Sequence, residues 1–212
     1  MKKLIIIGAS GFGREVLCWA LDCEKVQHNW RMHGFLDENL KALDGFDCKY
    51  SILDTPSNYL PTKEDVFICA IGDPEKKIYV CNLLLSRGAK FMNLIHPDAI
   101  IGRNNNLGKG CVFCPGAAIT TNVTLGDFIT LNVYSGIGHD SRIGNGVTLS
   151  AHCDVTGNTV LGEGVFLGSH ATILPSVQVG DYAKIGAGSV VLKKVKAGTT
   201  VMGNPAKQIA GF

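Results

Sequence analysis

The chain has no long run of charge of one sign and no long apolar segment. Its 20 Lys and Arg residues nearly balance 18 Asp and Glu residues, so the formal net charge is only +2. Nothing in this balance favours nucleic acid or an anionic membrane as a partner. The apolar run at residues 4–7 is too short for a signal peptide, and no segment approaches the roughly 18 apolar residues of a membrane span. We therefore expect a cytoplasmic protein.

The cysteines also lack the pattern of a metal site or a disulfide framework. Eight are scattered along the chain, and only Cys111 and Cys114 form a CxxC pair. No second CxxC pair and no matching His pair accompany them, which argues against zinc. We expect no metal, and we expect reduced thiols, as is typical of the cytosol.

What the chain does contain is a period of six. Every sixth residue from Ile95 to Val191 is large and apolar. Given the 46% hydrophobic content, such a run arises by accident on the order of once in a million. The seventeen positions are Ile95, Ile101, Leu107, Phe113, Ile119, Leu125, Leu131, Ile137, Ile143, Leu149, Val155, Leu161, Leu167, Ile173, Val179, Ile185 and Val191.

Two further tracks accompany these positions. Residues four further on are mostly small or β-branched, such as Ala117, Ser141 and Ala171, and Gly directly follows many of the large residues. Together they predict a parallel β-helix of hexapeptides. Three hexapeptides close a coil of 18 residues, and stacked strands lie about 4.8 Å apart. The glycines are expected at corners that need φ > 0.

The N-terminal third reads as a small Rossmann-like α/β unit. Expected strands cover residues 3–7, 34–38 and 65–71, with helices over 14–23 and 76–86 and one more strand at 90–94. Strands that alternate with helices predict a parallel sheet. The domains are therefore 1–94, for nucleotide binding, and 95–212, the β-helix.

A glycine turn follows the first strand of this unit. Its glycines, Gly8, Gly11 and Gly13, are spaced G-x-x-G-x-G, which differs from the dinucleotide fingerprint G-x-G-x-x-G. Such a turn lets backbone N–H groups approach phosphates, and an acid that closes the second strand, here Asp37, commonly meets a ribose hydroxyl. A mononucleotide, such as the UDP of a nucleotide sugar, suits the size of the unit. The alternative is a turn that serves only close packing.

The histidines supply candidate chemistry. His139 stands at the third position of its hexapeptide and should point out of the solenoid. Imidazole is suited to proton removal at neutral pH, and the carboxylate of Asp140 could orient it; an exposed His with an ordinary acidic neighbour is the alternative. His152 and His170 are 18 residues apart and should stack about 4.8 Å apart, lining a cleft or a subunit contact, or binding a metal if a third ligand came from elsewhere.

The order of motifs resembles a known family. A GASGFG turn, a FLDE strand end, an AIGD strand end, the NLIHPDAIIG junction, the hexapeptides and a terminal GNPAK follow one another. This order is similar to the bacterial sugar acetyltransferases of the PglD/NeuD kind, which are hexapeptide-repeat acyltransferases with a left-handed β-helix. The resemblance implies a nucleotide sugar on the N-terminal domain, a homotrimer, and acetyl-CoA between adjacent subunits.

The resemblance also implies site residues. It makes His139 the base and Asp140 its orienter. The implied acetyl-CoA contacts are Thr148, Gly168, Ser169, Lys184, Gly186, Ala187 and Lys207, and the implied nucleotide-sugar contacts are Ser10, Gly11, Phe12, Asp37, Glu38 and Gly72. Two positions depart from the family: many members carry His at Phe12, and some carry a second His at Thr148.

The leading functional hypothesis is acetyl transfer from acetyl-CoA to the amine of a nucleotide-linked amino sugar, such as a UDP-4-amino sugar, for surface-glycan biosynthesis. The nearest alternative is O-acetylation of a sugar hydroxyl, such as that of a sialic acid. A nicotinamide oxidoreductase would rest on the glycine turn alone, and a non-catalytic β-helix scaffold would leave His139 without a role.

Overall fold

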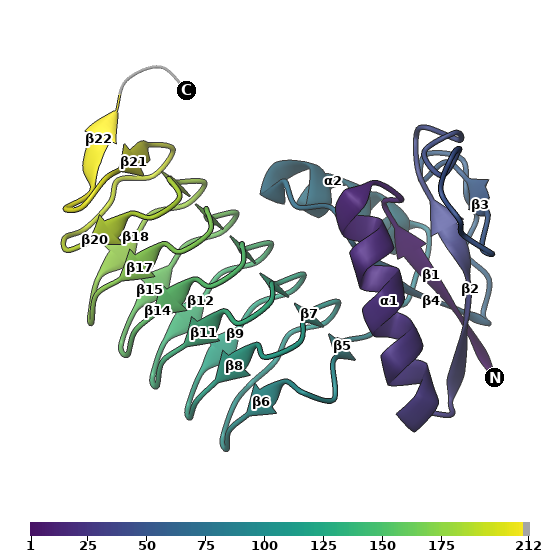
Figure 1. The fold of residues 1–212 in the computed structure, drawn as a ribbon, viewed down its shortest axis with the longest axis horizontal. Coiled ribbons are helices and arrows are strands. Elements are labelled where there is room, and N and C mark those ends of the chain that lie inside the picture. The colour runs from purple at the N-terminus through teal and green to yellow at the C-terminus, as the bar shows by residue number, and fades with distance from the viewer. Residues whose placement is uncertain (210–212) are drawn as a thin grey trace.

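A computed structural model describes residues 1–209 and has two parts, an N-terminal α/β unit and a long solenoid of stacked coils (Figure 1). The predicted combination of a parallel α/β sheet with a parallel β-helix is confirmed. The last three residues of the predicted second domain, 210–212, lie outside the described residues. None of the helices in the described part is long and apolar enough to cross a membrane.

The N-terminal unit is one four-stranded parallel sheet in the order β3-β2-β1-β4. Its elements are β1 (Lys2–Ile7), α1 (Gly11–Val26), β2 (Trp30–Leu36), β3 (Ile52–Asp54), β4 (Asp65–Cys69) and α2 (Pro74–Ser86). The chain moves from β1 outward to β3 and then returns to place β4 on the other side of β1. The strand order therefore reverses between β1 and β4, the point where open α/β sheets bind ligands.

Two details of this unit differ from the expectation. No strand forms over 90–94; there, Phe91 makes a single bridge to Phe67, and Leu94–Ile95 forms β5, which pairs with the solenoid instead. The short strand β3 was not expected, because Ile52–Asp54 offers only three residues of pattern. The junction therefore belongs to the solenoid from Leu94 onward.

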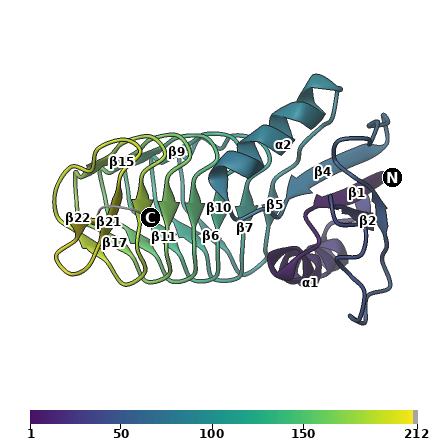
Figure 2. The ribbon, with the colours of Figure 1, turned by 90° about the horizontal axis from the view of Figure 1, so that it is seen from above.

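Up to β20 (Val190–Val191) the solenoid consists of two-residue strands that pair with the strand one coil, or 18 residues, away, as Thr130 pairs with Thr148. Figure 2 shows the coils edge-on. One face carries β5 (Leu94–Ile95), β7 (Val112–Phe113), β10 (Thr130–Leu131), β13 (Thr148–Leu149), β16 (Phe166–Leu167), β19 (Lys184–Ile185), β21 (Thr200–Met202) and the antiparallel β22 (Lys207–Ile209). We call this face B.

Two further faces close each coil. Face C carries β6 (Ile100–Ile101), β8 (Ala118–Ile119), β11 (Gly136–Ile137), β14 (Asp154–Val155), β17 (Thr172–Ile173) and β20 (Val190–Val191). Face D carries β9 (Thr124–Leu125), β12 (Arg142–Ile143), β15 (Val160–Leu161) and β18 (Gln178–Val179). The chain thus passes from face B to C to D in every coil, which gives the solenoid its B–C, C–D and D–B corners.

The period of six forms the core, as predicted. From Phe113 to Val191 all large positions are at most 4% exposed, and the small track beside them is equally buried. The three positions of the first coil are less buried: Ile101 is 36% exposed, and Ile95 and Leu107 are partly buried. A continuous column of apolar side chains therefore holds the coils together.

The expected role of the repeat glycines was wrong. The left-handed corners fall two residues after these glycines, at positions such as Phe128, Asp140 and His170. The glycines themselves have no positive φ; a Cβ on Gly144 would instead lie 2.6 Å from the backbone nitrogen of Glu163 in the next coil. Glycine is needed there because the backbone of the next coil passes too close for a side chain.

The two parts pack against each other along α2 and the first coils (Figure 2). Phe91 links them, since its ring lies 5.9 Å from the ring of Phe67 in the N-terminal sheet and 5.0 Å from the ring of Phe128 in the solenoid. Val112 and Cys114 of the first coils are buried in the same apolar cluster as β1 and α1. The orientation of the N-terminal unit on the solenoid is therefore fixed by apolar contacts.

Candidate active site

The exposed side chains of His139 and Asp140 form a pair at the C–D corner that follows β11. Their exposed fractions are 57% and 47%, and Nδ1 of the imidazole lies 2.7 Å from Oδ2 of the carboxylate. Asp140 adopts the left-handed corner conformation (φ 59°), and its Oδ1 accepts a hydrogen bond from the amide of Asn122, one coil below, at 3.3 Å. The hydrogen bond to His139 lowers the pKa of the Asp140 carboxyl, although desolvation opposes this.

The other face of the imidazole rests on the next coil. Gly157 lies 18 residues after His139, and a Cβ at Gly157 would lie 2.6 Å from Nε2 of the imidazole. The absence of a side chain there leaves room for the ring. The carboxylate on one edge and the glycine against the ring thus hold the imidazole in place, with Nε2 free of any hydrogen bond among the described residues.

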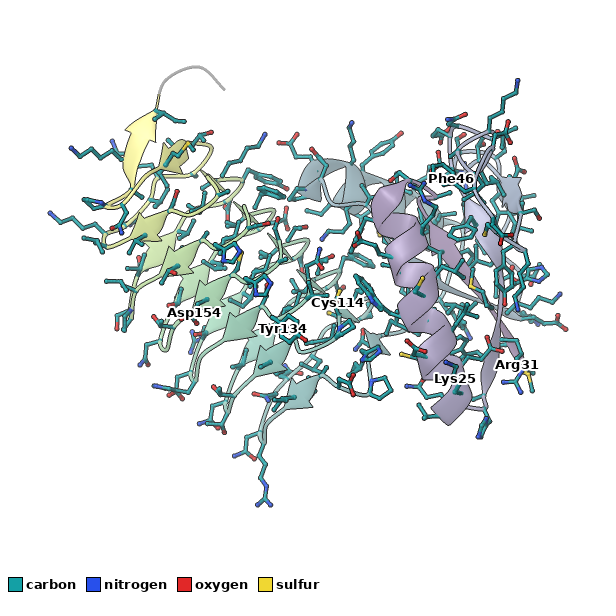
Figure 3. The ribbon with its side chains drawn as sticks, in the orientation of Figure 1. Lys25, Arg31, Phe46, Cys114, Tyr134 and Asp154 are labelled. Carbon is teal, nitrogen blue, oxygen red and sulfur yellow. The ribbon has the colours of Figure 1, made fainter. Side chains whose placement is uncertain are left out.

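A stack of three aromatic rings marks the B–C corner. His152 and His170 stack with ring centroids 4.8 Å apart and an interplanar angle of 7°, as the 18-residue spacing predicted. Tyr134 extends the stack below His152, at 5.4 Å, and its position on the solenoid is labelled in Figure 3. The sequence reasoning missed Tyr134, although the same spacing of 18 would have found it.

One copy of the chain does not bring all the predicted residues together. His139 lies at the C–D corner, whereas Gly168 and Ser169 follow β16, and Gly186 and Ala187 follow β19, all at the B–C corner. The width of face C separates the two corners. A site that uses both sets of residues needs a second copy of the chain.

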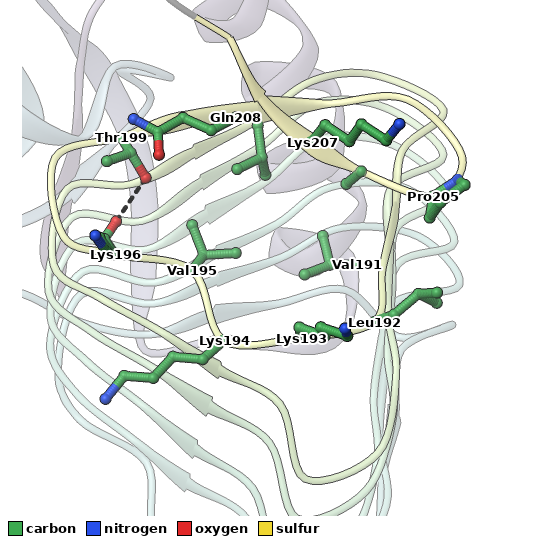
Figure 4. Close-up of a pocket in the computed structure, with 12 residues that line it drawn as sticks. Val191, Leu192, Lys193, Lys194, Val195, Lys196, Thr199, Pro205, Lys207 and Gln208 are labelled. Atoms are coloured by element: carbon green, nitrogen blue, oxygen red, sulfur yellow. Dashed lines mark hydrogen bonds between the residues drawn. The ribbon is translucent and has the colours of Figure 1, made fainter.

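The predicted lysines lie near the C-terminal end of the solenoid. Lys184 lines a shallow apolar hollow with Phe166, Gly186 and Met202. Lys207 lines a second hollow of about 400 Å³, which also includes Lys193, Lys194 and Lys196 (Figure 4). No Asp or Glu occurs from residue 182 to residue 209, so this end of the molecule attracts anions. The sequence reasoning missed these three lysines, which the run LKKVK could have indicated.

The predicted nucleotide-binding residues meet at one edge of the N-terminal sheet. Ile7, at the end of β1, pairs with Leu36 on β2 and with Cys69 on β4. The residues that follow each strand therefore gather at the same edge, and they include Ser10 and Gly11, Asp37 and Glu38, and Gly72. Ser10 precedes α1 as its N-cap and makes no capping hydrogen bond with its side chain, while Gly11 is exposed with no atom within 4 Å of a built Cβ.

Two of these residues have other contacts than expected. Asp37 uses Oδ2 to accept a hydrogen bond from the backbone N–H of Ala9 at 2.7 Å and Oδ1 to accept one from Asn39, so its carboxylate braces the glycine turn. Phe12 is half-buried and packs edge-to-face on Trp19 of the same helix, at 6.2 Å. Packing also explains Gly13, since a Cβ there would lie 2.1 Å from the carbonyl oxygen of Gly8.

Thr148 is not available to a coenzyme in this chain, in contrast to the expectation. It is 4% exposed, and its hydroxyl accepts a hydrogen bond of 2.7 Å from Nζ of Lys77. The reason is that α2 covers this part of face B, which the hexapeptide pattern alone could not reveal. His96, at 7% exposed, accepts a hydrogen bond from the backbone N–H of Asp98, which gives it a structural role at the junction.

Comparison with protein families agrees with this architecture. The PglD N-terminal domain matches residues 3–84, and the bacterial transferase hexapeptide (six repeats) matches residues 158–193. The chain therefore combines a PglD N-terminal domain with the hexapeptide repeats of bacterial transferases, and the resemblance seen in the sequence is confirmed.

Individual relatives narrow this class. The chain is 30% identical over 139 residues to the GDP-perosamine N-acetyltransferase of Escherichia coli O157:H7, and the aligned stretch spans 64% of this chain and 61% of that protein. It matches the acetyltransferase domain of PglB from Neisseria gonorrhoeae FA1090 in complex with acetyl coenzyme A with 28% identity and a TM-score of 0.86, covering 98% of this chain and 99% of the other.

A third relative was solved in complex with two ligands. PerB from Caulobacter crescentus, in complex with CoA and GDP-perosamine, matches with 25% identity and a TM-score of 0.88 over 99% of this chain and 98% of the other. The likeness to solved structures thus covers both the N-terminal unit and the solenoid.

Proposed function

We propose that the protein is an acetyltransferase that moves the acetyl group of acetyl-CoA to the amine of a nucleotide-linked amino sugar. The observation that carries the proposal is the exposed His139–Asp140 pair, held at a corner of an acyltransferase solenoid with Nδ1 and Oδ2 2.7 Å apart. The relatives named for N-acetylation favour an amine over a hydroxyl as the acceptor. Surface-glycan assembly is the proposed setting, and the eight free thiols fit a cytoplasmic location.

The proposed chemistry uses the free ring nitrogen of His139. Because Asp140 stays ionised, Nδ1 of His139 keeps its proton and donates a hydrogen bond to the carboxylate. The lone pair of Nε2 is then left to accept a proton. The amine nitrogen attacks the thioester carbonyl carbon as Nε2 takes the amine proton. The C–N bond forms, the C–S bond breaks, and the coenzyme leaves as a thiol after receiving that proton from the imidazolium. Asp140 stabilises the imidazolium in between.

We place the site between two copies of the chain. The base lies at the C–D corner and the predicted coenzyme contacts at Ser169 and Ala187 lie at the B–C corner, so a neighbouring copy has to supply one of the two sets. A flat-sided solenoid suits cyclic packing, and a homotrimer is the assembly that we propose. Face C offers small residues such as Ala118 and Gly136 for such a contact.

The proposed coenzyme runs along the solenoid axis, from His139 toward the lysines at the C-terminal end. Residues 139, 157, 175 and 193 share one column of the C–D corner, because β11, β14, β17 and β20 are in register. Three coils separate Lys193 from His139, or about 14 Å, a distance comparable to an extended pantetheine arm. We propose that the lysines of the terminal hollow, with Lys207 and Lys184, meet the phosphates.

The nucleotide sugar is assigned to the N-terminal sheet edge. Backbone N–H groups at Ser10 and Gly11 start α1, where a phosphate is stabilised by the helix N-terminus, and Glu38 and Gly72 close the edge at the reversal of strand order. Phosphate binding by backbone groups accommodates UDP, GDP or dTDP equally. The test therefore has to vary both the nucleotide and the sugar of the acceptor.

The test is the release of free thiol from acetyl-CoA in the presence of UDP-, GDP- and dTDP-linked amino sugars, with free sialic acid included. We expect release with at least one nucleotide-linked amine and an acetamido product by mass spectrometry. Release with sialic acid alone would assign O-acetylation instead, and release with none of these acceptors would contradict the proposed function.

A further inference from the structure

Lys77 is a buried cation that no carboxylate pairs with in the described part of the chain. Its side chain, on α2, is 1% exposed. Nζ donates hydrogen bonds to Oγ1 of Thr148 at 2.7 Å, to Oγ1 of Thr130 at 3.0 Å and to the carbonyl oxygen of Val147 at 3.3 Å. An ammonium group has three donors, and all three are satisfied by neutral oxygens of the solenoid.

These acceptors bracket one particular coil. Thr130 and Thr148 are paired residues on β10 and β13, one coil apart, and the chain between them carries His139 and Asp140. Lys77 therefore donates hydrogen bonds to both ends of the coil that carries the proposed base.

The other end of the connection is the nucleotide-binding edge. Helix α2 begins at Pro74, capped by Asp73, whose Oδ1 accepts a hydrogen bond from the N–H of Lys76 and whose carbonyl oxygen accepts one from the N–H of Lys77. Gly72, one of the residues gathered at the sheet edge, directly precedes this cap. Lys77 thus lies one helical turn from the proposed nucleotide site.

We propose that Lys77 is a positioning residue for acetyl transfer, which fixes the nucleotide-binding edge of the N-terminal unit relative to the coil that bears His139. The inference rests on the proposed function. It holds whether the nucleotide edge serves the base of its own chain or that of a neighbour, because symmetry repeats the same spacing in every copy.

The energetics argue that stability alone does not explain this lysine. Taking an ammonium group out of water is costly, and a well-packed apolar side chain of similar volume is often as stable or more so. Burial lowers the pKa of Lys77 to about 8, against the opposing influence of the Cys69, Cys81 and Cys111 thiols and of Asp73. What a three-donor group adds is a fixed geometry between two elements, since a methionine in its place could slide.

The test compares Lys77→Met with Lys76→Met, an exposed lysine on the same helix. For Lys77→Met we expect kcat/KM with the nucleotide-linked amino sugar to fall about 10- to 100-fold, as misplacement of bound reactants does. The Kd of acetyl-CoA and the slow rate with the same amino sugar lacking its nucleotide should stay within about twofold, since neither uses the alignment. Lys76→Met should match the parent protein in all three measurements.

Removing the acceptor should mimic removing the donor. Thr148→Val is expected to lower the same kcat/KM, and the double variant with Lys77→Met should lose no more than Lys77→Met alone. The proposal would be overturned if the variants lost equal activity with the nucleotide-linked amino sugar and with the amino sugar that lacks its nucleotide. A full parental rate with the nucleotide-linked sugar would overturn it as well. Hydrogen exchange tests the proposal without any substrate, and so remains informative even if the proposed function fails. Faster amide exchange in α2 of Lys77→Met supports a role of Lys77 in fixing α2 to the solenoid, and unchanged exchange contradicts it.

Discussion

The two parts of the molecule offer their functional groups in different ways. The N-terminal unit presents backbone N–H groups at strand ends, braced by Asp37, whereas the solenoid presents side chains at its corners, as at His139. Backbone groups bind charge without choosing a chemistry, while a placed imidazole can move a proton. The difference indicates that changes in the first part should affect binding of the nucleotide sugar and changes in the second should affect the chemical step.

The largest effect is expected at the base. His139→Ala should lower kcat by at least about 100-fold, because no other group at that corner can remove the proton, while the Kd values of both co-substrates stay close to those of the parent protein. His33→Ala, an exposed histidine on β2, is the control and should keep full activity. Steady-state thiol release measures the activity of both variants. Equal activities of His139→Ala and His33→Ala would indicate that the solenoid is a non-catalytic scaffold.

A smaller loss should follow from crowding the imidazole. In Gly157→Ala the new Cβ would lie 2.6 Å from Nε2 of His139, so the ring has to swing away from its position beside Asp140. We expect kcat to fall about 10- to 100-fold with little change in the thermal midpoint, since an exposed ring moves easily. A fall in stability without a fall in kcat would show that the ring position does not matter.

A change at the nucleotide-binding edge of the N-terminal unit should affect binding and not the chemical step. Gly11→Val adds a side chain at the start of α1, where there is now open space, and should obstruct a phosphate at the helix N-terminus. We expect the KM for the nucleotide sugar to rise about tenfold with kcat nearly unchanged, a loss of uniform binding. Calorimetric titration of acetyl-CoA is the control and should be unaffected; a fall in kcat alone would break the division between the two parts.

The last expected effect is a pH dependence of stability. The pKa of Lys77 is about 8 in the folded protein and about 10.5 when unfolded, so between these values the unfolded chain binds more protons. Stability from this group therefore rises with pH, by at most about 1.4 kcal/mol per unit. Urea unfolding at pH 7.5, 8.5 and 9.5 should show the parent protein gaining stability relative to Lys77→Met, because only the parent protein carries this buried ammonium group. A constant difference would contradict this.

The repeat made the solenoid predictable. From β5 to β20 each strand pairs with the strand 18 residues away, so sequence number alone places a residue on a face or a corner, and the outward position of His139 and the stacking of His152 on His170 followed from it. The positions of φ > 0 did not follow. A glycine can serve a left-handed corner or a close backbone approach, and only the stacking of coils, seen at Gly144, separates the two.

The N-terminal unit and the junction were less predictable, for a physical reason. There, β1 pairs with β4, which lies some sixty residues away, and no period announces such a pairing. Lys77 gave no signal at all, since a lysine among charged helical residues normally faces water. Its burial depends on α2 covering face B, and that same contact removed Thr148 from the predicted coenzyme site.

The most direct test of the shared site mixes two inactive proteins. His139→Ala lacks the base, and Ser169→Trp should block the opposite corner that a coenzyme would line; each alone is expected to be inactive. Trimers refolded from an equal mixture should regain up to about a quarter of the parental activity, because a quarter of the contacts then join an intact base to an intact corner on a neighbouring copy. Mixed trimers without activity above that of the two parents would contradict the account.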